Sequence, residues 1–162
     1  NNLSGPINCS YVVYGTRKDT PKNIPEYRKL VKAIRWLGMK RVSKKVMPIM
    51  FGSTFLADKL RKSDRKQWLT MLQSNRKGGV VKATMGVIDR TGTYEQLGDI
   101  TTPTLIVVGD EDAATPYEKS ERMHFAIAGS KLAIIKGAGH TSTVEEPDQV
   151  NRVLSQFLTS CV

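Results

Sequence analysis

The sequence contains only two cysteines, Cys9 and Cys161, which stand near opposite ends of the 162 residues. Neither has a second cysteine or a histidine at ligand spacing, which argues against a zinc site and against a disulfide framework. No apolar run approaches the ~20 residues that a membrane helix needs, and no signal-peptide pattern opens the chain. Two free cysteines without a signal predict a cytoplasmic protein, and the start at Asn1 predicts a piece of a longer one.

Acidic residues are scarce in the first hundred positions, where 20 Lys and Arg face 7 Asp and Glu, a balance of +13. Residues 101–162 hold 5 Lys and Arg against 8 Asp and Glu, a balance of −3. A basic segment and a slightly acidic segment therefore meet near Ile100. The basic segment lacks the spacing of an RNA-recognition sheet and any zinc-finger ligands, and we expect no nucleic-acid or membrane partner. Its cations mostly fall on the polar side of amphipathic helices, as do Arg28, Lys29, Lys32 and Arg35. This pattern predicts a solvated face, and steering of an anionic substrate is the alternative.

The first hundred residues read as a short strand followed by helices. Ser10–Tyr14 is aromatic and β-branched and predicts a strand. Helical spacing of apolar residues then predicts four helices, over residues 25–37, 42–47, 64–74 and 80–89. We expect Gly38 to end the first helix and Pro48 to end the second. Residues 1–20 are assigned to a core strand and the entry to a cap, and 21–98 to a helical cap.

Residues 99–162 follow a different pattern, in which strands and helices alternate. Two apolar runs, residues 104–108 and 132–135, predict buried strands, each followed by a helix. Thr115 and Glu118 flank the start of the first helix as a capping box. We expect the last helix to start near Pro147 and to bury Val150, Val153, Leu154, Phe157 and Leu158. This order predicts an α/β fold with parallel strands and right-handed crossovers.

The chemistry concentrates in the loops after the two predicted strands. Reactive groups in parallel sheets collect where the strands end. The first loop holds Asp110, Glu111 and Asp112, and the second holds His140, one of two histidines. A carboxylate beside an imidazole can fix its tautomer and stabilise the imidazolium, leaving the other ring nitrogen free to take a proton. The second histidine, His124, falls within a predicted helix and is expected to be an ordinary helix residue.

These two loops resemble those of the α/β-hydrolase family. Pro103–Pro116 is similar to the family's penultimate core strand and acid loop, and Gly137–His140 with Glu146-Pro147 to its histidine loop and last helix. Within that family, the sequence most resembles the small lactonase-like hydrolases, such as 3-oxoadipate enol-lactonase, and the carbon–carbon-bond hydrolases. The resemblance implies that the chain is the C-terminal part of an α/β-hydrolase fold preceded by a helical cap, with no metal or organic cofactor.

The resemblance also implies residue roles. His140 is the expected general base and Asp112 the acid that orients it, with Asp110 as the alternative acid. The expected reaction is hydrolysis of a small-molecule ester, lactone or similarly activated carbonyl, with an anionic substrate as one candidate. The family's Gly-x-Ser-x-Gly elbow, which carries the nucleophile, is absent. We reject Ser53, which has one of the glycines and no preceding buried strand, and Ser142, which lies too close to His140 in sequence.

The incomplete triad leads to two expectations. The chain alone should be inactive as an enzyme, and it should pair with the missing N-terminal part of the same fold or associate with itself, because a narrow sheet leaves an unpaired edge. The alternative is a non-catalytic binding or scaffold module that kept an α/β-hydrolase-like fold. A Gly-x-Ser-x-Gly motif upstream of Asn1 would favour the enzyme.

Overall fold

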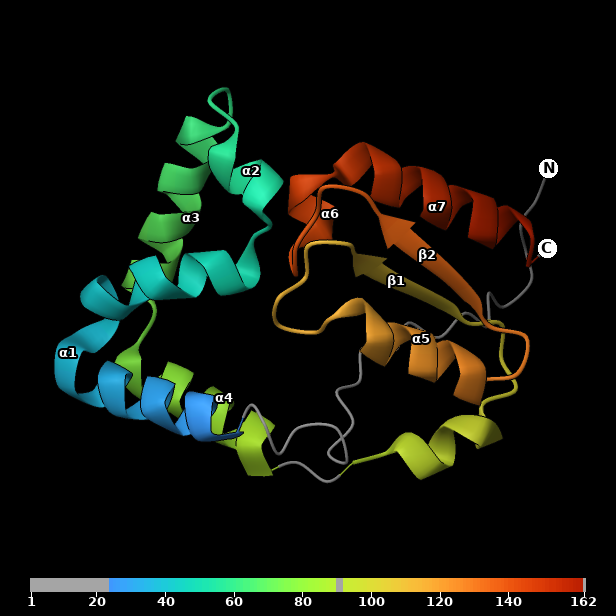
Figure 1. Ribbon diagram of the computed structural model, residues 1–162, viewed down its shortest axis with the longest axis horizontal. Helices are drawn as coiled ribbons and strands as arrows, with labels where there is room; N and C mark the ends of the chain where they lie inside the picture. The colour runs from blue at the N-terminus through green and yellow to red at the C-terminus, as the bar shows by residue number, and fades with distance from the viewer. Residues whose placement is uncertain (1–23, 90–91, 162) are drawn as a thin grey trace.

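A computed structural model describes residues 24–89 and 92–161 and shows two groups of elements (Figure 1). A block of helices lies at one end, and two strands flanked by helices lie at the other. The strand predicted over Ser10–Tyr14 lies outside the described residues. Within the described ranges, no helix is long and apolar enough to cross a membrane.

The helical block contains α1 (Ile24–Met50), α2 (Ser53–Ala57), α3 (Lys62–Ser74) and α4 (Lys77–Asp89). Gly38 interrupts α1 with φ 73° and ψ 170°, a conformation that favours glycine, so the predicted stop is a kink between two helical stretches. The prediction that Pro48 ends the second stretch was wrong, because the helix continues to Met50. Proline lacks the N–H that would donate to the carbonyl four residues earlier, so Pro48 removes one backbone hydrogen bond without ending the helix.

Two apolar clusters hold the helical block together. The first joins α1 to α4 through Ile34, Val42 and Ile88, all less than 5% exposed. The second joins α1, α2 and α3, where the Phe51 and Phe55 rings stack with centroids 4.9 Å apart. Trp68 and Leu72 of α3 pack against this second cluster. The short helix α2, which the sequence did not predict, therefore lies where the block meets the rest of the chain.

The second group contains the 3-10 helix η2 (Tyr94–Asp99), then β1 (Leu105–Gly109), α5 (Tyr117–Ala126), β2 (Lys131–Ile135), α6 (Ser142–Glu145) and α7 (Pro147–Thr159). The two strands are parallel, with Leu105 opposite Lys131 and Gly109 opposite Ile135. Helix α5 lies on one side of the strands and α7 on the other (Figure 1). The predicted α/β class and its parallel strands are confirmed.

Two predictions of burial in this group were wrong. The second strand is not fully buried, since Ile134 is 48% exposed and, among the described residues, β2 pairs with β1 alone. Leu158 on α7 is 41% exposed, whereas Val150 and Phe157 are buried as expected. Val153 and Leu154 are half-buried against the sheet. A two-stranded sheet covers only part of the apolar face of a 13-residue helix.

The predicted capping box at the start of α5 was also wrong. The residue that precedes the helix is Pro116, and no side chain caps the helix there. The hydroxyl of Thr115 donates instead to Asp112, 2.7 Å away. The acid loop therefore takes the hydroxyl that the sequence pattern assigned to the helix end.

Candidate active site

The two strand-end loops leave the sheet side by side. Gly109 ends β1 opposite Ile135, which ends β2. The backbone N–H of Asp110 donates to the Ile135 carbonyl at 3.1 Å, and that of Glu111 donates to the Ala138 carbonyl at 2.9 Å. These bonds continue the parallel pairing beyond the strands and fix the two loops against each other.

This arrangement brings Asp112 and His140 into contact. The Nδ1 atom of His140 lies 2.9 Å from Oδ2 of Asp112, a hydrogen-bond distance. The Asp112 side chain is 5% exposed and the His140 side chain 31%. The carboxylate is therefore shielded from water while part of the imidazole can be reached from solvent.

Asp112 is held in place by its own loop. Its Oδ1 accepts the backbone N–H groups of Ala114 and Thr115, both at 2.8 Å. Its Oδ2 accepts the Thr115 hydroxyl at 2.7 Å in addition to the imidazole. An ionised carboxylate offers about four lone-pair sites, and these four bonds use them all. The geometry thus fits a carboxylate that stays ionised and does not rotate.

The contact shifts both pKa values in the direction that favours an ion pair. Burial by itself would raise the pKa of Asp112, but the hydrogen bonds from His140 and Thr115 outweigh it and lower that pKa. The pKa of His140 is raised, chiefly by its hydrogen bond to Asp112, with burial opposing and the charges of Asp112 and Glu145 adding to the rise. The imidazolium form of His140 is therefore stabilised.

The second ring nitrogen of His140 is available for chemistry. When Nδ1 carries the proton that Asp112 accepts, Nε2 is an acceptor. Among residues 24–89 and 92–161, only Asp112 and Thr115 hydrogen-bond to the ring, and both do so at Nδ1. Nε2 can therefore accept a proton from a group that reaches it.

The other candidates from the sequence lie elsewhere. Asp110, the alternative acid, is exposed, and its Oδ1 accepts the backbone N–H of Gly137 at 2.7 Å. Ser53 starts α2 and donates to Glu111 at 3.0 Å, and Ser142 starts α6. His124 is part of α5, and its Nδ1 lies 2.9 Å from the Ser130 hydroxyl.

Two carboxylates that the sequence analysis did not single out connect this site to the helical block. Glu111, in the acid loop, accepts the Thr54 hydroxyl at 2.6 Å and the Thr54 N–H at 2.8 Å, both from α2. The first of these bonds is the main reason that the pKa of Glu111 is lowered. Glu145, in α6, is 2% exposed and accepts the N–H of Gly52 at 2.7 Å. Of the two, only Glu111 belongs to a loop that the sequence analysis identified as a candidate site, the loop after the first predicted strand.

The site offers no metal-binding cluster within the part of the chain that the structure describes. No three His, Cys, Asp or Glu side chains gather there in a way that could hold an ion. What the arrangement can do is acid–base chemistry, through one imidazole whose tautomer and orientation a buried carboxylate fixes.

Comparisons with known proteins agree with this fold. A family model described as "TAP-like protein" matches residues 86–161. A 2-hydroxy-6-oxononadienedioate/2-hydroxy-6-oxononatrienedioate hydrolase from Klebsiella pneumoniae subsp. pneumoniae is 40% identical over 63 residues, which are 39% of this chain and 22% of that protein. A proline iminopeptidase from Lactobacillus crispatus is 41% identical over 64 residues, 40% of this chain and 22% of that one.

Solved structures extend the likeness to the helical block. An esterase from Thermogutta terrifontis superimposes with a TM-score of 0.76 at 24% identity, over 88% of this chain and 52% of its own. The enol-lactonase from Burkholderia xenovorans superimposes with a TM-score of 0.69 at 23% identity, over 83% of this chain and 51% of its own. These structures show that the chain has the α/β-hydrolase fold. It spans about half the length of these structures and about a fifth of the two curated relatives.

Proposed function

We propose that this chain supplies the base and the orienting acid of a Ser-His-Asp triad, in a hydrolase that acts on an ester, a lactone or a similarly activated carbonyl. The observation that carries the proposal is the 2.9 Å contact between His140 Nδ1 and the buried Asp112 carboxylate at the ends of adjacent parallel strands. Because none of the 162 residues lies in a Gly-x-Ser-x-Gly elbow, the proposal takes the nucleophilic serine from a polypeptide segment outside them.

The proposed chemistry follows from the state of His140. Its Nε2 takes the serine proton as the serine oxygen attacks the substrate carbonyl, which becomes a tetrahedral oxyanion. The oxyanion collapses, the leaving group departs with the proton from Nε2, and an acyl-enzyme remains. Water then repeats the sequence and releases the acid product. Asp112 stays ionised and stabilises the imidazolium that forms in each half-reaction.

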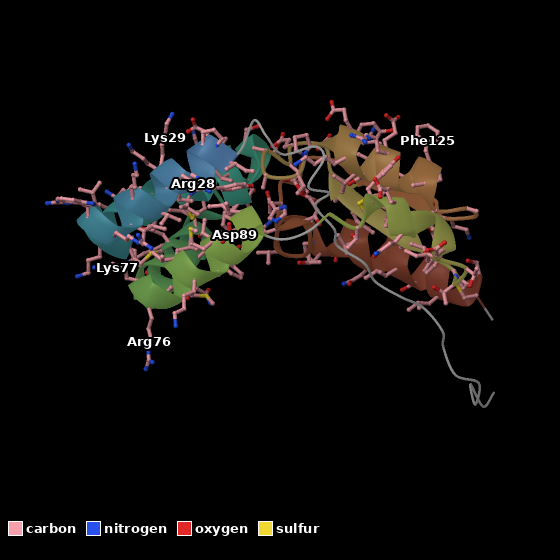
Figure 2. The ribbon with its side chains drawn as sticks, turned by 90° about the horizontal axis from the view of Figure 1, so that it is seen from below. Arg28, Lys29, Arg76, Lys77, Asp89 and Phe125 are labelled. Carbon is pink, nitrogen blue, oxygen red and sulfur yellow. The ribbon has the colours of Figure 1, made fainter. Side chains whose placement is uncertain are left out.

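The helical block from α1 to α4 is proposed as the cap over the substrate. Its cations include Lys29 and Arg76, whose side chains project outward in Figure 2, and the exposed residues Arg28 and Lys77. Outward-pointing cations favour a solvated surface over direct contact with substrate, so steering of an anionic substrate stays a prediction. The cytoplasmic location also stays a prediction.

Association with another polypeptide is part of the proposal. Ile134 on β2 is 48% exposed and Phe125 on α5 is 77% exposed, and Phe125 stands away from the fold in Figure 2. Apolar surface of this kind favours contact with the missing N-terminal part of the fold or with a second copy of the chain.

The test is hydrolysis of a nitrophenyl ester. The purified chain alone should show no turnover above background, and turnover should appear when it is mixed with, or joined to, the preceding segment of its protein. The same mixture prepared with His140→Ala should be inactive, whereas His124→Ala, on α5, should retain activity. A chain that hydrolyses the ester alone, in a way that His140→Ala abolishes, would show that a nucleophile within residues 1–162 was overlooked. A joined protein with no hydrolase activity would favour the binding module.

A further inference from the structure

Glu145 is a buried carboxylate that the proposed mechanism does not use. It ends the short helix α6, five residues after His140, and its exposure is 2%. Burying a carboxylate is costly unless hydrogen bonds replace the water that it loses. Its partners therefore show what the protein gains by keeping it there.

Four donor atoms surround this carboxylate. Oε2 accepts the backbone N–H of Gly52 at 2.7 Å and that of Gly139 at 3.0 Å. Oε1 accepts the N–H of Thr141 at 3.1 Å and lies 2.9 Å from the Thr141 hydroxyl. Gly139 and Thr141 are the neighbours of His140 on either side, and Gly52 lies between α1 and α2, 93 residues before Glu145. One side chain thus joins the backbone on both sides of the imidazole to the helical block.

The backbone contacts around Glu145 are equally close. A Cβ added to Gly139 would stand 2.3 Å from the Gly52 nitrogen, so the histidine loop and the α1–α2 junction meet backbone to backbone. The N–H of Thr141 also lies 3.1 Å from the Met50 carbonyl. Arg61 closes the other end of α6 by donating to the carbonyls of Val144 and Glu145, at 2.9 and 2.7 Å. This assembly leaves α6 little freedom to move.

We propose that Glu145 is a positioning residue, which holds the histidine loop against the α1–α2 junction and so keeps the His140 ring on Asp112. The inference deepens the proposed function and rests on it for the role of His140. The charge of Glu145 also favours the imidazolium form, since it contributes to the raised pKa of His140. The carboxylate thus acts on His140 in two ways, through its hydrogen bonds to the backbone of Gly139 and Thr141 and through the electrostatic effect of its charge.

Glu145→Gln separates this role from simple space-filling, because it keeps the shape of the side chain. Glutamine has one acceptor oxygen, and its NH₂ group is a donor. The glutamine oxygen can accept either the N–H groups of Gly52 and Gly139 or the N–H and hydroxyl of Thr141. The two groups that it does not accept then face the NH₂ donor. Glu146→Gln is the matched control, because the neighbouring Glu146 is half-buried and accepts a hydrogen bond from Gln149 at 2.8 Å.

The experiment uses the whole 162-residue chain and two NMR measurements, amide hydrogen exchange and the pH titration of His140. In Glu145→Gln, exchange at Gly52 and Gly139, or at Thr141, should be at least ~10-fold faster, the equivalent of about 1.4 kcal/mol. The pKa of His140 should fall, which a purely structural role would not cause. Glu146→Gln should change neither. Unchanged exchange at all three amides, or an unchanged His140 titration, would overturn the proposal.

A milder variant keeps the test decisive if Glu145→Gln does not fold. Thr141→Val keeps the N–H but removes the hydroxyl, which lies 2.9 Å from Oε1 and 3.0 Å from the Met50 carbonyl. Thr141 is then held less firmly, so exchange at its N–H should be faster than in the unsubstituted protein. If it does not accelerate at all, the proposal fails.

In the joined protein, Glu145→Gln should lower kcat more than it changes KM. A joined protein without activity would refute the hydrolase assignment, and the exchange and titration results would still decide the role of Glu145.

Discussion

Replacing Gly139 by alanine tests the close contact between the histidine loop and the helical block. The new Cβ would lie 2.3 Å from the Gly52 nitrogen and 2.7 Å from the Phe51 carbonyl carbon, where ordinary contact begins at 3.4 Å. The obstructing atoms are backbone, so no side chain can swing aside. The two segments must separate by about 1 Å, which also stretches the bonds from Gly52 and Gly139 to Glu145.

The expected cost follows from these two effects. Overpacking that shifts a backbone costs about 1–3 kcal/mol. Weakening hydrogen bonds to a buried charge adds about 1.5–3 kcal/mol. We expect Gly139→Ala to lower the free energy of unfolding by about 3–5 kcal/mol. At about 2–4 °C per kcal/mol for a chain of this size, Tm should fall by about 6–20 °C.

Thermal unfolding followed by circular dichroism measures this change. Gly79→Ala is the control, because Gly79 lies in α4 and an added Cβ meets nothing within 4 Å there. Alanine in an exposed helix is better than glycine by about 0.5–1 kcal/mol, so Tm should rise slightly. If Gly139→Ala is as stable as the unsubstituted protein, the backbone contact that joins the two groups of elements is wrong.

Three further predictions concern charge. The pKa of Glu111 is lowered by its bonds to Thr54, so Glu111 stabilises the fold above its ordinary value of 4.5 and the effect fades as pH falls. In urea unfolding, Glu111→Gln should be less stable than the unsubstituted protein near neutral pH and equally stable in acid. Glu118→Gln, which loses only the interaction of its charge with the start of α5, should change the stability much less. The pKa of His140 is raised, so its stabilising effect is complete below its ordinary value of 6.5 and is lost as pH rises through the higher folded value. Asp112→Asn should therefore flatten the stability profile over that range, and an unchanged profile would contradict the ion pair. If the basic face steers an anionic substrate, kcat/KM of the joined enzyme should fall with salt, since screening acts over ~8 Å at 0.15 M, and Lys29→Gln should reduce that dependence.

Sequence reasoning found the parts of the site that are local. The apolar run of β1 and the acidic loop after it are adjacent in the chain, and so are β2 and the loop with His140. Parallel pairing then brings the two loops together, because strands of similar length end at the same edge. A contact between an acid of the first loop and His140 could be predicted for that reason, and the resemblance to the α/β-hydrolase family selected Asp112, 28 residues away, over Asp110.

The anchors between the two groups of elements could not be predicted, because their partners are distant in sequence. Glu145 meets Gly52 across 93 residues, and Glu111 meets Thr54 across 57. In a single sequence, Glu145 is one of two adjacent glutamates, and nothing distinguishes the buried one from the half-buried one. The capping-box prediction at Thr115 failed for a related reason, since the pattern fitted a local role and the nearby Asp112 carboxylate bound the hydroxyl instead.

The most direct test of the account compares two neighbouring aspartates in the joined, active enzyme. Asp112→Asn should leave the fold intact and lower kcat by about 10⁴-fold, because an amide no longer holds the imidazole in the correct tautomer. Asp110→Asn should leave kcat close to that of the unsubstituted enzyme, since Asp110 is exposed and bonds to the Gly137 backbone. Equal losses in the two variants, or a larger loss for Asp110→Asn, would contradict the assignment of Asp112 as the partner of His140.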